Sequence, residues 1–324
     1  MKEVKLADLS EIPFLDVSEL EGRFINTLNF YDEDGWVMWI PTNKGLRKFK
    51  FELVEGLYFA NNPESKDDIY FYFLDFLVQR ASFPSIEKSL SGLQDDFLNL
   101  GASLAKLDLF YRERESIGGG ISRMVSTEIE YIFSVCRSVF DLLQEIISRL
   151  WNTIDLVDEE VRKQPLPETF SKVIKLLGEN GETGGLISKY GLPLSVAEFY
   201  ARNSEFFISL REFRDNIAHR GSSVDIIFST DRGFAVRDTL MPFVKYGVWT
   251  DEHKQNELCS LRPAIGYVIH ETFVACEDFS RTIAAIIKFP PPIAPGLRLY
   301  MRSYFNDYLI KNVKVVRESQ WWDT

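Results

Sequence analysis

The sequence predicts a mainly α-helical fold, in which a helical bundle carries a β-rich N-terminal portion and one late β-hairpin. In several long segments apolar residues recur at intervals of three and four, which is the period of an amphipathic helix. The first quarter of the chain instead contains short aromatic and β-branched runs separated by turn residues. Hydrophobic residues make up 45% of the 324 positions, so the chain can bury a core and a disordered protein is excluded.

Changes of pattern divide the chain into three predicted regions. Residues 1–80 form the β-rich N-terminal portion, residues 81–290 the helical bundle, and residues 291–324 a tail that packs on the bundle. The stretch "FPPPIAP" ends the bundle, because proline lacks a backbone N–H and clashes inside a helix. The tail is amphipathic, but its pattern does not distinguish helix from strand.

Three candidate strands lie in the N-terminal portion, in the segments "RFINTLNF", "GWVMWIP" and "LRKFKFEL". The last two are predicted to form a hairpin closed at Thr42 to Gly45, since turn residues separate them. The segment "DDIYFYFLDFLVQ" has no clear period, and we interpret it as a helix.

Two long helices are predicted after Pro84, separated by the flexible break "SIGGG". The apolar stripe of the first consists of Leu90, Leu93, Phe97, Leu100, Leu104 and Leu107. The stripe of the second keeps its period over eight positions, Val125, Ile129, Ile132, Cys136, Val139, Leu143, Ile146 and Leu150.

A third helix is predicted from Ser195, which forms a capping box with Glu198, to Gly221, a residue type that commonly ends helices. Its apolar stripe is Phe199, Phe206, Leu210, Phe213 and Ile217. The segment "VDIIFSTDRGFAVRD" then predicts a hairpin that turns at 230–233.

A fourth helix is expected from about Asp251 to Lys288, kinked or divided at Pro263. Two of the three histidines fall in this part of the chain. His253 is expected to be a solvated surface residue, and His270 a partly buried structural one. A metal site near His270 is the weaker interpretation, because the neighbouring Cys, Glu and Asp lack the spacing of a ligand set.

Composition excludes several classes of protein. The formal net charge of −11 argues against a protein that coats nucleic acid, but it leaves room for a local basic patch. The three cysteines lie far apart without a CxxC pair, so neither a disulfide scaffold nor a zinc site is expected. There is no signal-peptide core and no apolar run of about 18 residues, so we expect a cytoplasmic protein without a membrane partner.

The stretch "REFRDNIAHRGSS" at the end of the third helix contains the one constellation with recognisable chemistry. At 100° per residue, Ile208, Glu212, Asp215 and His219 form a line on the face away from the apolar stripe. Such a line is either a solvated face or a surface that meets a partner, namely another helix or a second copy of the chain.

The residue types in this stretch suit RNA cleavage without a metal. Asp215 lies four residues before His219, and both its carboxylate and the helix dipole favour the protonated imidazole. The Arg214 guanidinium suits phosphate oxygens. In such a reaction the ribose 2′-hydroxyl attacks the phosphate, a cation stabilises the developing charge, and a protonated group assists the leaving oxygen. Arg214 and His219 are about 140° apart on an ideal helix, so a distorted helix end or a second subunit must bring them together.

The string "RDNIAHRG" resembles the R-x4–6-H motif of the HEPN superfamily, whose domains are helical bundles with this motif late in one helix. Many members are metal-independent ribonucleases of toxin–antitoxin, phage-defence or RNA-processing systems, and they act as dimers with both motifs at a shared cleft. The resemblance implies that His219 is the general acid/base, that Arg214 binds phosphate and that Asp215 orients them. We expect further substrate contacts from Arg211, Asn216 and Arg220.

The expected partners are an RNA substrate, a second copy of the chain that packs through the motif helix, and an antitoxin protein. No cofactor or metal is expected. The alternative is a non-catalytic HEPN-type module that binds nucleic acid, a nucleotide or a protein. A third interpretation is an unrelated helical protein with a chance Arg–His spacing.

Overall fold

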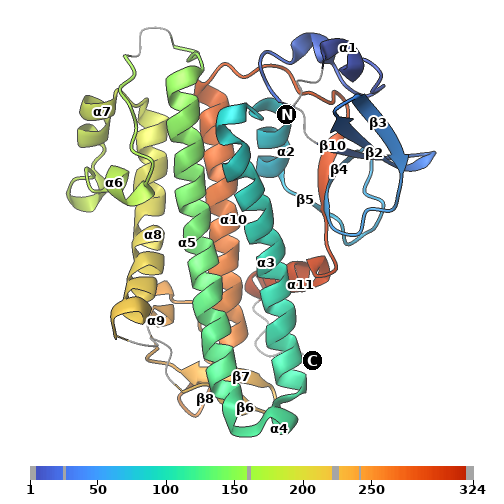
Figure 1. Ribbon diagram of the computed structural model, residues 1–324. Coiled ribbons are helices and arrows are strands. Elements are labelled where there is room, and N and C mark those ends of the chain that lie inside the picture. The colour runs from blue at the N-terminus through green and yellow to red at the C-terminus, as the bar shows by residue number, and fades with distance from the viewer. Residues whose placement is uncertain (1–4, 25–26, 159–161, 221–225, 241, 319–324) are drawn as a thin grey trace.

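The computed structural model describes residues 5–24, 27–158, 162–220, 226–240 and 242–318. Within these ranges the side chains of residues 180, 214–220, 313 and 315–318 lie outside the description. A group of long helices occupies one side of the molecule, a sheet covers the upper part of its other side, and a smaller sheet lies at its lower end (Figure 1).

Four long helices form the bundle. They are α3 (Glu87–Arg112), α5 (Ile121–Thr153), α8 (Leu194–Arg220) and α10 (Leu261–Ile286). Helix α5 lies at the centre and packs against the other three. All eight residues of its predicted stripe are buried, so the periodicity located this helix and its core-facing side correctly. Helix α8 begins at Leu194, one residue before the Ser195 predicted as its cap.

Shorter helices surround this group. They are α1 (Leu6–Leu9), α2 (Tyr72–Arg80), α4 (Arg114–Ile117), α6 (Phe170–Ile174), α7 (Gly184–Tyr190), α9 (Phe243–Tyr246) and α11 (Asn306–Glu318). Between α4 and α5 the chain reverses through Gly118, whose φ of 64° is strained for residues with a side chain.

The larger sheet has the strand order β3-β2-β1-β4-β10-β5. Its strands are β1 (Leu28–Asp32), β2 (Gly35–Thr42), β3 (Gly45–Lys50), β4 (Gly56–Ala60), β5 (Ile69–Tyr70) and β10 (Arg298–Arg302). The predicted hairpin at Thr42 to Gly45 is confirmed by the pairing of β2 with β3. Strand β10 comes from the tail and lies between β4 and β5, antiparallel to both.

The smaller sheet has the order β6-β7-β9-β8, with β6 (Phe228–Thr230), β7 (Gly233–Arg237), β8 (Lys254–Gln255) and β9 (Leu258–Ser260). The pairing of β6 with β7 confirms the hairpin predicted across 230–233. The predicted start of the fourth helix is wrong, because β8 and β9 form a second hairpin there. Asn256 and Glu257 have φ of 52° and 64°, a left-handed conformation that suits a two-residue hairpin turn and excludes a helix.

The prediction of a mainly α fold with a HEPN-like bundle is therefore wrong. The protein is a mixed α/β fold, with sheets of six and four strands in the ranges that the structure describes. The predicted division at residues 80 and 290 stays a prediction, and residues on both sides of each boundary share one hydrophobic core. That core includes Phe30 of β1, Phe97 of α3 and Leu299 of β10.

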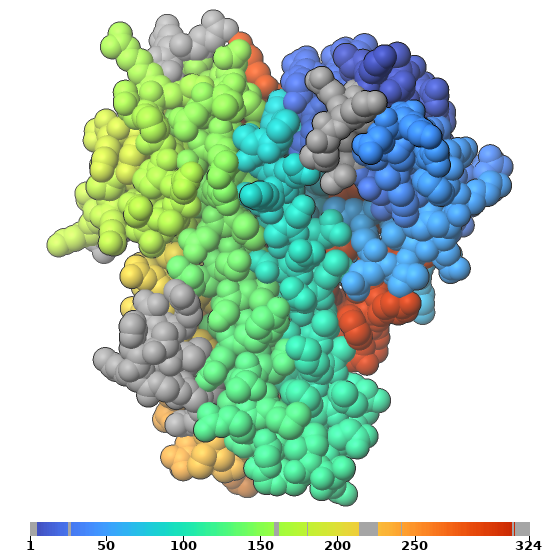
Figure 2. Space-filling model, in the orientation of Figure 1, coloured from blue at the N-terminus to red at the C-terminus, as the bar shows by residue number. Residues whose placement is uncertain are grey.

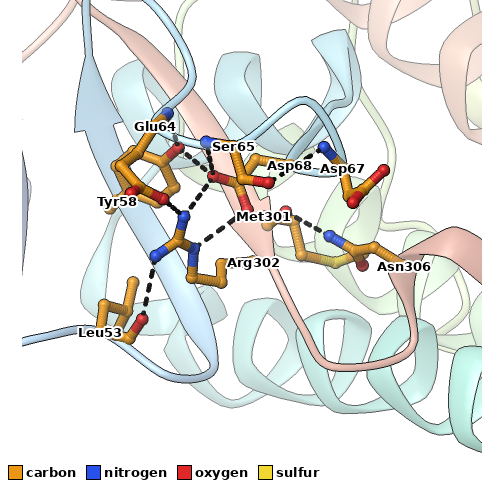
Figure 3. A network of polar contacts seen from close by, with 9 residues as sticks. All are labelled: Leu53, Tyr58, Glu64, Ser65, Asp67, Asp68, Met301, Arg302 and Asn306. Carbon is orange, nitrogen blue, oxygen red and sulfur yellow. Dashed lines mark hydrogen bonds and ion pairs between the residues drawn. The ribbon is translucent and has the colours of Figure 1, made fainter.

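A polar network ties β10 to β4 and to the loop before β5 (Figure 3). The Arg302 guanidinium donates two hydrogen bonds of 3.0 Å to the Asp68 carboxylate and also contacts Glu64. The Tyr58 hydroxyl donates to the same carboxylate at 2.6 Å, and burial keeps it protonated by raising the pKa of Tyr58. Arg302 also lies 4.7 Å from the centre of the Trp36 ring. Because these groups satisfy one another inside the protein, we assign the network a structural role.

Asp96 lies at the contact between α3 and α5 and provides a test of this packing. Burial raises the pKa of its carboxyl to about 6, the neighbouring Asp95 adds to the rise, and a hydrogen bond with Ser138 of α5 opposes it. A raised pKa means that the folded state holds the proton more tightly than the unfolded state. Protonated Asp96 therefore makes its full contribution to the free energy of unfolding below about pH 4. This contribution is lost as the pH rises through about 6.

Asp96→Asn is expected to raise the free energy of unfolding at pH 7 by about 1–2 kcal/mol, a range reduced for the partial exposure of the carboxyl. The variant should also flatten the fall in stability of the parent between about pH 4 and pH 7. Urea denaturation across this range measures both effects. The control is Asp95→Asn, an exposed neighbour that should change stability by less than about 0.5 kcal/mol. Equal changes in the free energy of unfolding in the two variants would contradict the raised pKa assigned to Asp96.

Candidate functional site

Aromatic side chains anchor the helix that carries the motif. In α8 the fully buried Phe207 lies 4.8 Å from Phe170, measured between ring centres. Further along α8, Phe213 stacks on Phe133 of α5, with 3.9 Å between the ring centres. Since residue 213 directly precedes the motif, this contact attaches the start of the motif to the central helix of the bundle.

The motif itself occupies the last two turns of α8, because the helix continues to Arg220. The side chains of residues 214–220 lie outside the described part of the structure. The predicted positions and roles of five side chains therefore stay predictions, namely Arg214, Asp215, Asn216, His219 and Arg220. Arg211, the remaining predicted substrate contact, is half-buried and engaged with another residue.

The described part of α8 has one exposed face beside its buried one. Ile208 is 40% exposed and Glu212 is exposed, and these are the first two positions of the line predicted to continue to Asp215 and His219. The buried face differs from the predicted stripe, because it includes Phe207 and Ser209, whereas Phe206 is only partly buried. The Ser209 hydroxyl accepts a hydrogen bond of 2.7 Å from Tyr246 at the end of α9.

The other histidines have structural surroundings. The prediction that His253 is a solvated residue is wrong, because it is buried and its Nδ1 accepts a hydrogen bond of 3.1 Å from the Thr250 backbone. His270 Nδ1 lies 3.2 Å from a carboxylate oxygen of Glu271. Over the described ranges no three His, Cys, Asp or Glu side chains gather as a metal-binding group would.

The three cysteines are buried free thiols. Burial raises the pKa of Cys136 to about 12 and that of Cys259 to about 11, and the pKa of Cys276 also lies well above its ordinary value. These thiols stay protonated at neutral pH, so they are poor nucleophiles. Two ion pairs involve α5: Arg137 lies 3.1 Å from Asp141, and Glu128 lies 2.9 Å from Lys106 of α3.

A basic pocket of about 610 Å³ lies between α3, α10, α11 and the β6–β7 hairpin. In Figure 2 the red atoms of α11 lie against the teal atoms of α3, below the blue N-terminal sheet. One carboxylate, that of Asp108, lines the pocket beside five cationic side chains, Arg112, Arg232, Arg262, Lys311 and Lys314. In a chain of net charge −11, this is a local basic patch of the kind that composition left open.

Sequence reasoning missed this pocket, because its cations come from four elements that are distant in the chain. The nearest signal is the lysine spacing in "KNVKVVR", a segment whose sequence pattern does not distinguish helix from strand. Once α11 is seen as a helix, Lys311 and Lys314 are three residues apart and lie on one side of it.

No protein-family model, curated protein or solved structure matches this chain. The described helices also include none with the length and apolar character needed to cross a membrane. The functional conclusions below therefore depend on the motif and on the geometry of this chain alone.

Proposed function

We propose that this protein is a metal-independent endoribonuclease that uses an R-x4–6-H motif like that of the HEPN superfamily, with Arg214 and His219 as its catalytic pair. The observation that carries the proposal is the sequence Arg-Asp-Asn-Ile-Ala-His in the last two turns of a long helix. The surroundings of α8 support it. Phe213 attaches the start of the motif to α5, while the face that begins with Ile208 and Glu212 is open to a substrate or a second subunit.

In the proposed reaction the ribose 2′-hydroxyl of RNA loses its proton to solvent water as its oxygen attacks the adjacent phosphorus, and the bond to the 5′-oxygen breaks. Arg214 stabilises the negative charge that develops on the phosphate oxygens, and the His219 imidazolium gives its proton to the leaving 5′-oxygen. Asp215 keeps the imidazole oriented and favours its protonated form. Arg211, Asn216 and Arg220 are the proposed contacts to the rest of the RNA.

Incubation of labelled RNA with the protein in EDTA tests this chemistry, with DNA of the same sequence as the matched control. The proposal expects RNA fragments that end in 2′,3′-cyclic phosphate and no cleavage of the DNA, which lacks the attacking hydroxyl. Cleavage of the DNA as well as the RNA, or cleavage of RNA only after a metal is added, would contradict the proposal. Binding of RNA without cleavage would instead favour the alternative, a non-catalytic binding module.

The proposed enzyme is a homodimer that packs through the motif helix, since one helix places Arg214 and His219 about 140° apart. The exposed Ile208 is the contact that we propose for the dimer, because an aliphatic side chain on this face gains from burial. If the protein acts in defence or as a toxin, an antitoxin protein is its second partner. In that role, expression of the protein should harm the cell, and His219→Ala should remove this toxicity.

Ile208→Asp is expected to raise the dissociation constant of the dimer by about tenfold or more, because it places a carboxylate in an apolar contact. Light scattering after size exclusion at micromolar concentration measures the mass. The matched control is Leu109→Asp, which changes an apolar residue of similar exposure, 46%, on α3. A parent protein that is monomeric, or equal effects of the two variants, would overturn the proposed dimer.

A further inference from the structure

The basic pocket has a firmly built apolar part. Leu261 and Ile265 of α10 and Phe234 of β7 are buried and line it. The Tyr111 hydroxyl of α3 donates a hydrogen bond of 3.0 Å to the Thr230 carbonyl, and the Tyr111 ring meets the Phe234 ring edge-on at 5.4 Å between centres. These contacts fix the β6–β7 hairpin to α3, so the pocket is formed before any ligand enters.

Helix α11 forms the opposite wall and is held closely against α3. A side chain at Gly101 would meet Phe305 at 3.2 Å, so glycine permits this close approach. The amide of Asn306 donates a hydrogen bond of 2.8 Å to the Met301 carbonyl, and Leu309 is buried. The lysines of this helix that line the pocket are therefore presented by a fixed element.

Carboxylates lie beside two of the cationic side chains of the pocket. Arg112 lies 3.1 Å from Asp108, and Lys311 lies 3.1 Å from Asp307, whose hydrogen bond raises the pKa of the lysine. Lys314 is exposed beside them, and Arg232 and Arg262 complete the set of five. The excess of positive charge in the lining favours an anion.

Asn312 gives an independent sign of a ligand. This residue lines the pocket and is only 3% exposed, yet its Nδ2 has no hydrogen-bond partner within the part of the chain that the structure describes. A buried donor without an acceptor is costly, typically by about 1–3 kcal/mol. Because this Nδ2 has almost no surface open to the pocket, a small rotation of the Asn312 amide would be needed for a ligand oxygen to satisfy it.

We propose that this pocket binds a small organic phosphate, with the phosphate at the cations and Asn312 and an apolar body against the partly buried Leu107, Tyr111 and Tyr308. A volume of about 610 Å³ suits a ligand of this size. Both a nucleoside monophosphate and an alkyl phosphate have this chemistry, a phosphate monoester on an apolar body. The described lining includes no residue of the motif, and the proposal does not depend on the proposed ribonuclease activity.

Isothermal titration calorimetry of the full chain with AMP and with octyl phosphate tests the proposal. The comparison probes are inorganic phosphate, which lacks the apolar body, and adenosine, which lacks the charge. We expect AMP or octyl phosphate to bind at least about tenfold more tightly than either comparison probe. Binding of AMP alone identifies a nucleotide-type ligand, and binding of octyl phosphate alone an alkyl-type one. No binding of either at about 1 mM would overturn the proposal.

Two variants locate the binding. Asn312→Leu removes the unpartnered donor at similar size, so the melting temperature should not fall, while binding should weaken by about tenfold or more. The double variant Lys311→Ala with Lys314→Ala changes only exposed side chains and should weaken binding similarly. The control, Lys44→Ala with Lys50→Ala, removes the same charge from the exposed edge of the N-terminal sheet and should not affect binding. Equal affinity in all of these proteins would place the ligand elsewhere and sink the proposal.

Discussion

Arg302→Ala is expected to lower the free energy of unfolding by about 3–5 kcal/mol, because it leaves the Asp68 carboxylate buried without its cation. The side chain of Arg302 is 13% exposed and that of Asp68 is 4% exposed, so the pair is largely shielded from water. The stacking of Arg302 on Trp36 is lost as well. Urea denaturation followed by circular dichroism measures the effect.

The pH dependence of this variant has a defined sign. Burial already raises the pKa of Asp68 above its ordinary value, and removal of the adjacent cation raises it further. A protonated Asp68 no longer needs Arg302. The stability lost in Arg302→Ala should therefore shrink as the solution is acidified and grow again as the pH returns to neutral.

Arg298→Ala is the matched control, since Arg298 lies on the same strand but is exposed, over the Tyr70 ring at 5.5 Å. It should cost less than about 1 kcal/mol. If both variants cost the same, the buried network does not hold β10 in the sheet, and its structural assignment is wrong.

The long helices could be predicted from the sequence because their signal is local. Eight apolar positions from Val125 to Leu150 repeat with the helical period, and each neighbour in the pattern lies within two turns. Both hairpins predicted at turn residues are present for the same reason. Such features depend on residues that are close in the chain.

The sheets could not be predicted in full because their pairing is not local. Strand β10, from Arg298 to Arg302, is only five residues long and pairs with β4, more than two hundred positions earlier in the chain. Its short amphipathic sequence fits helix and strand equally, and only the contact with β4 decides between them. The fold class was wrong for this reason.

The same limit applies to the functional residues. The Arg214–His219 pattern is local and could be read directly, whereas the basic pocket gathers Arg112, Arg262 and Lys311 from three distant helices. The polar neighbours of His253 in the sequence predict an exposed position, although the fold buries it beside Thr250. Burial of a polar residue depends on tertiary packing, which a short stretch of sequence does not reveal.

The second large effect concerns catalysis. His219→Ala is expected to lower the rate of RNA cleavage by about 10²–10⁴-fold, which is the usual contribution of a positioned acid or base. Arg214→Ala should cost a similar factor by removing the group that stabilises charge on the phosphate. Arg214→Lys should recover only part of it, because lysine keeps the charge but not the planar pair of donors. Single-turnover cleavage of labelled RNA measures each rate.

His270→Ala is the matched control for these variants. It also removes one imidazole from the chain, but His270 contacts Glu271 on α10 and has no place in the proposed reaction. Its cleavage rate should equal that of the parent. A large loss in this control would show that the assay reports folding and not the chemistry of the motif.

The most direct test of the central claim is the ratio of the RNA-cleavage rate constants of the parent and His219→Ala, measured in EDTA with both proteins shown to be folded. The account predicts a ratio of about 10² or more. A ratio near one, or a parent protein that cleaves no RNA, would contradict it.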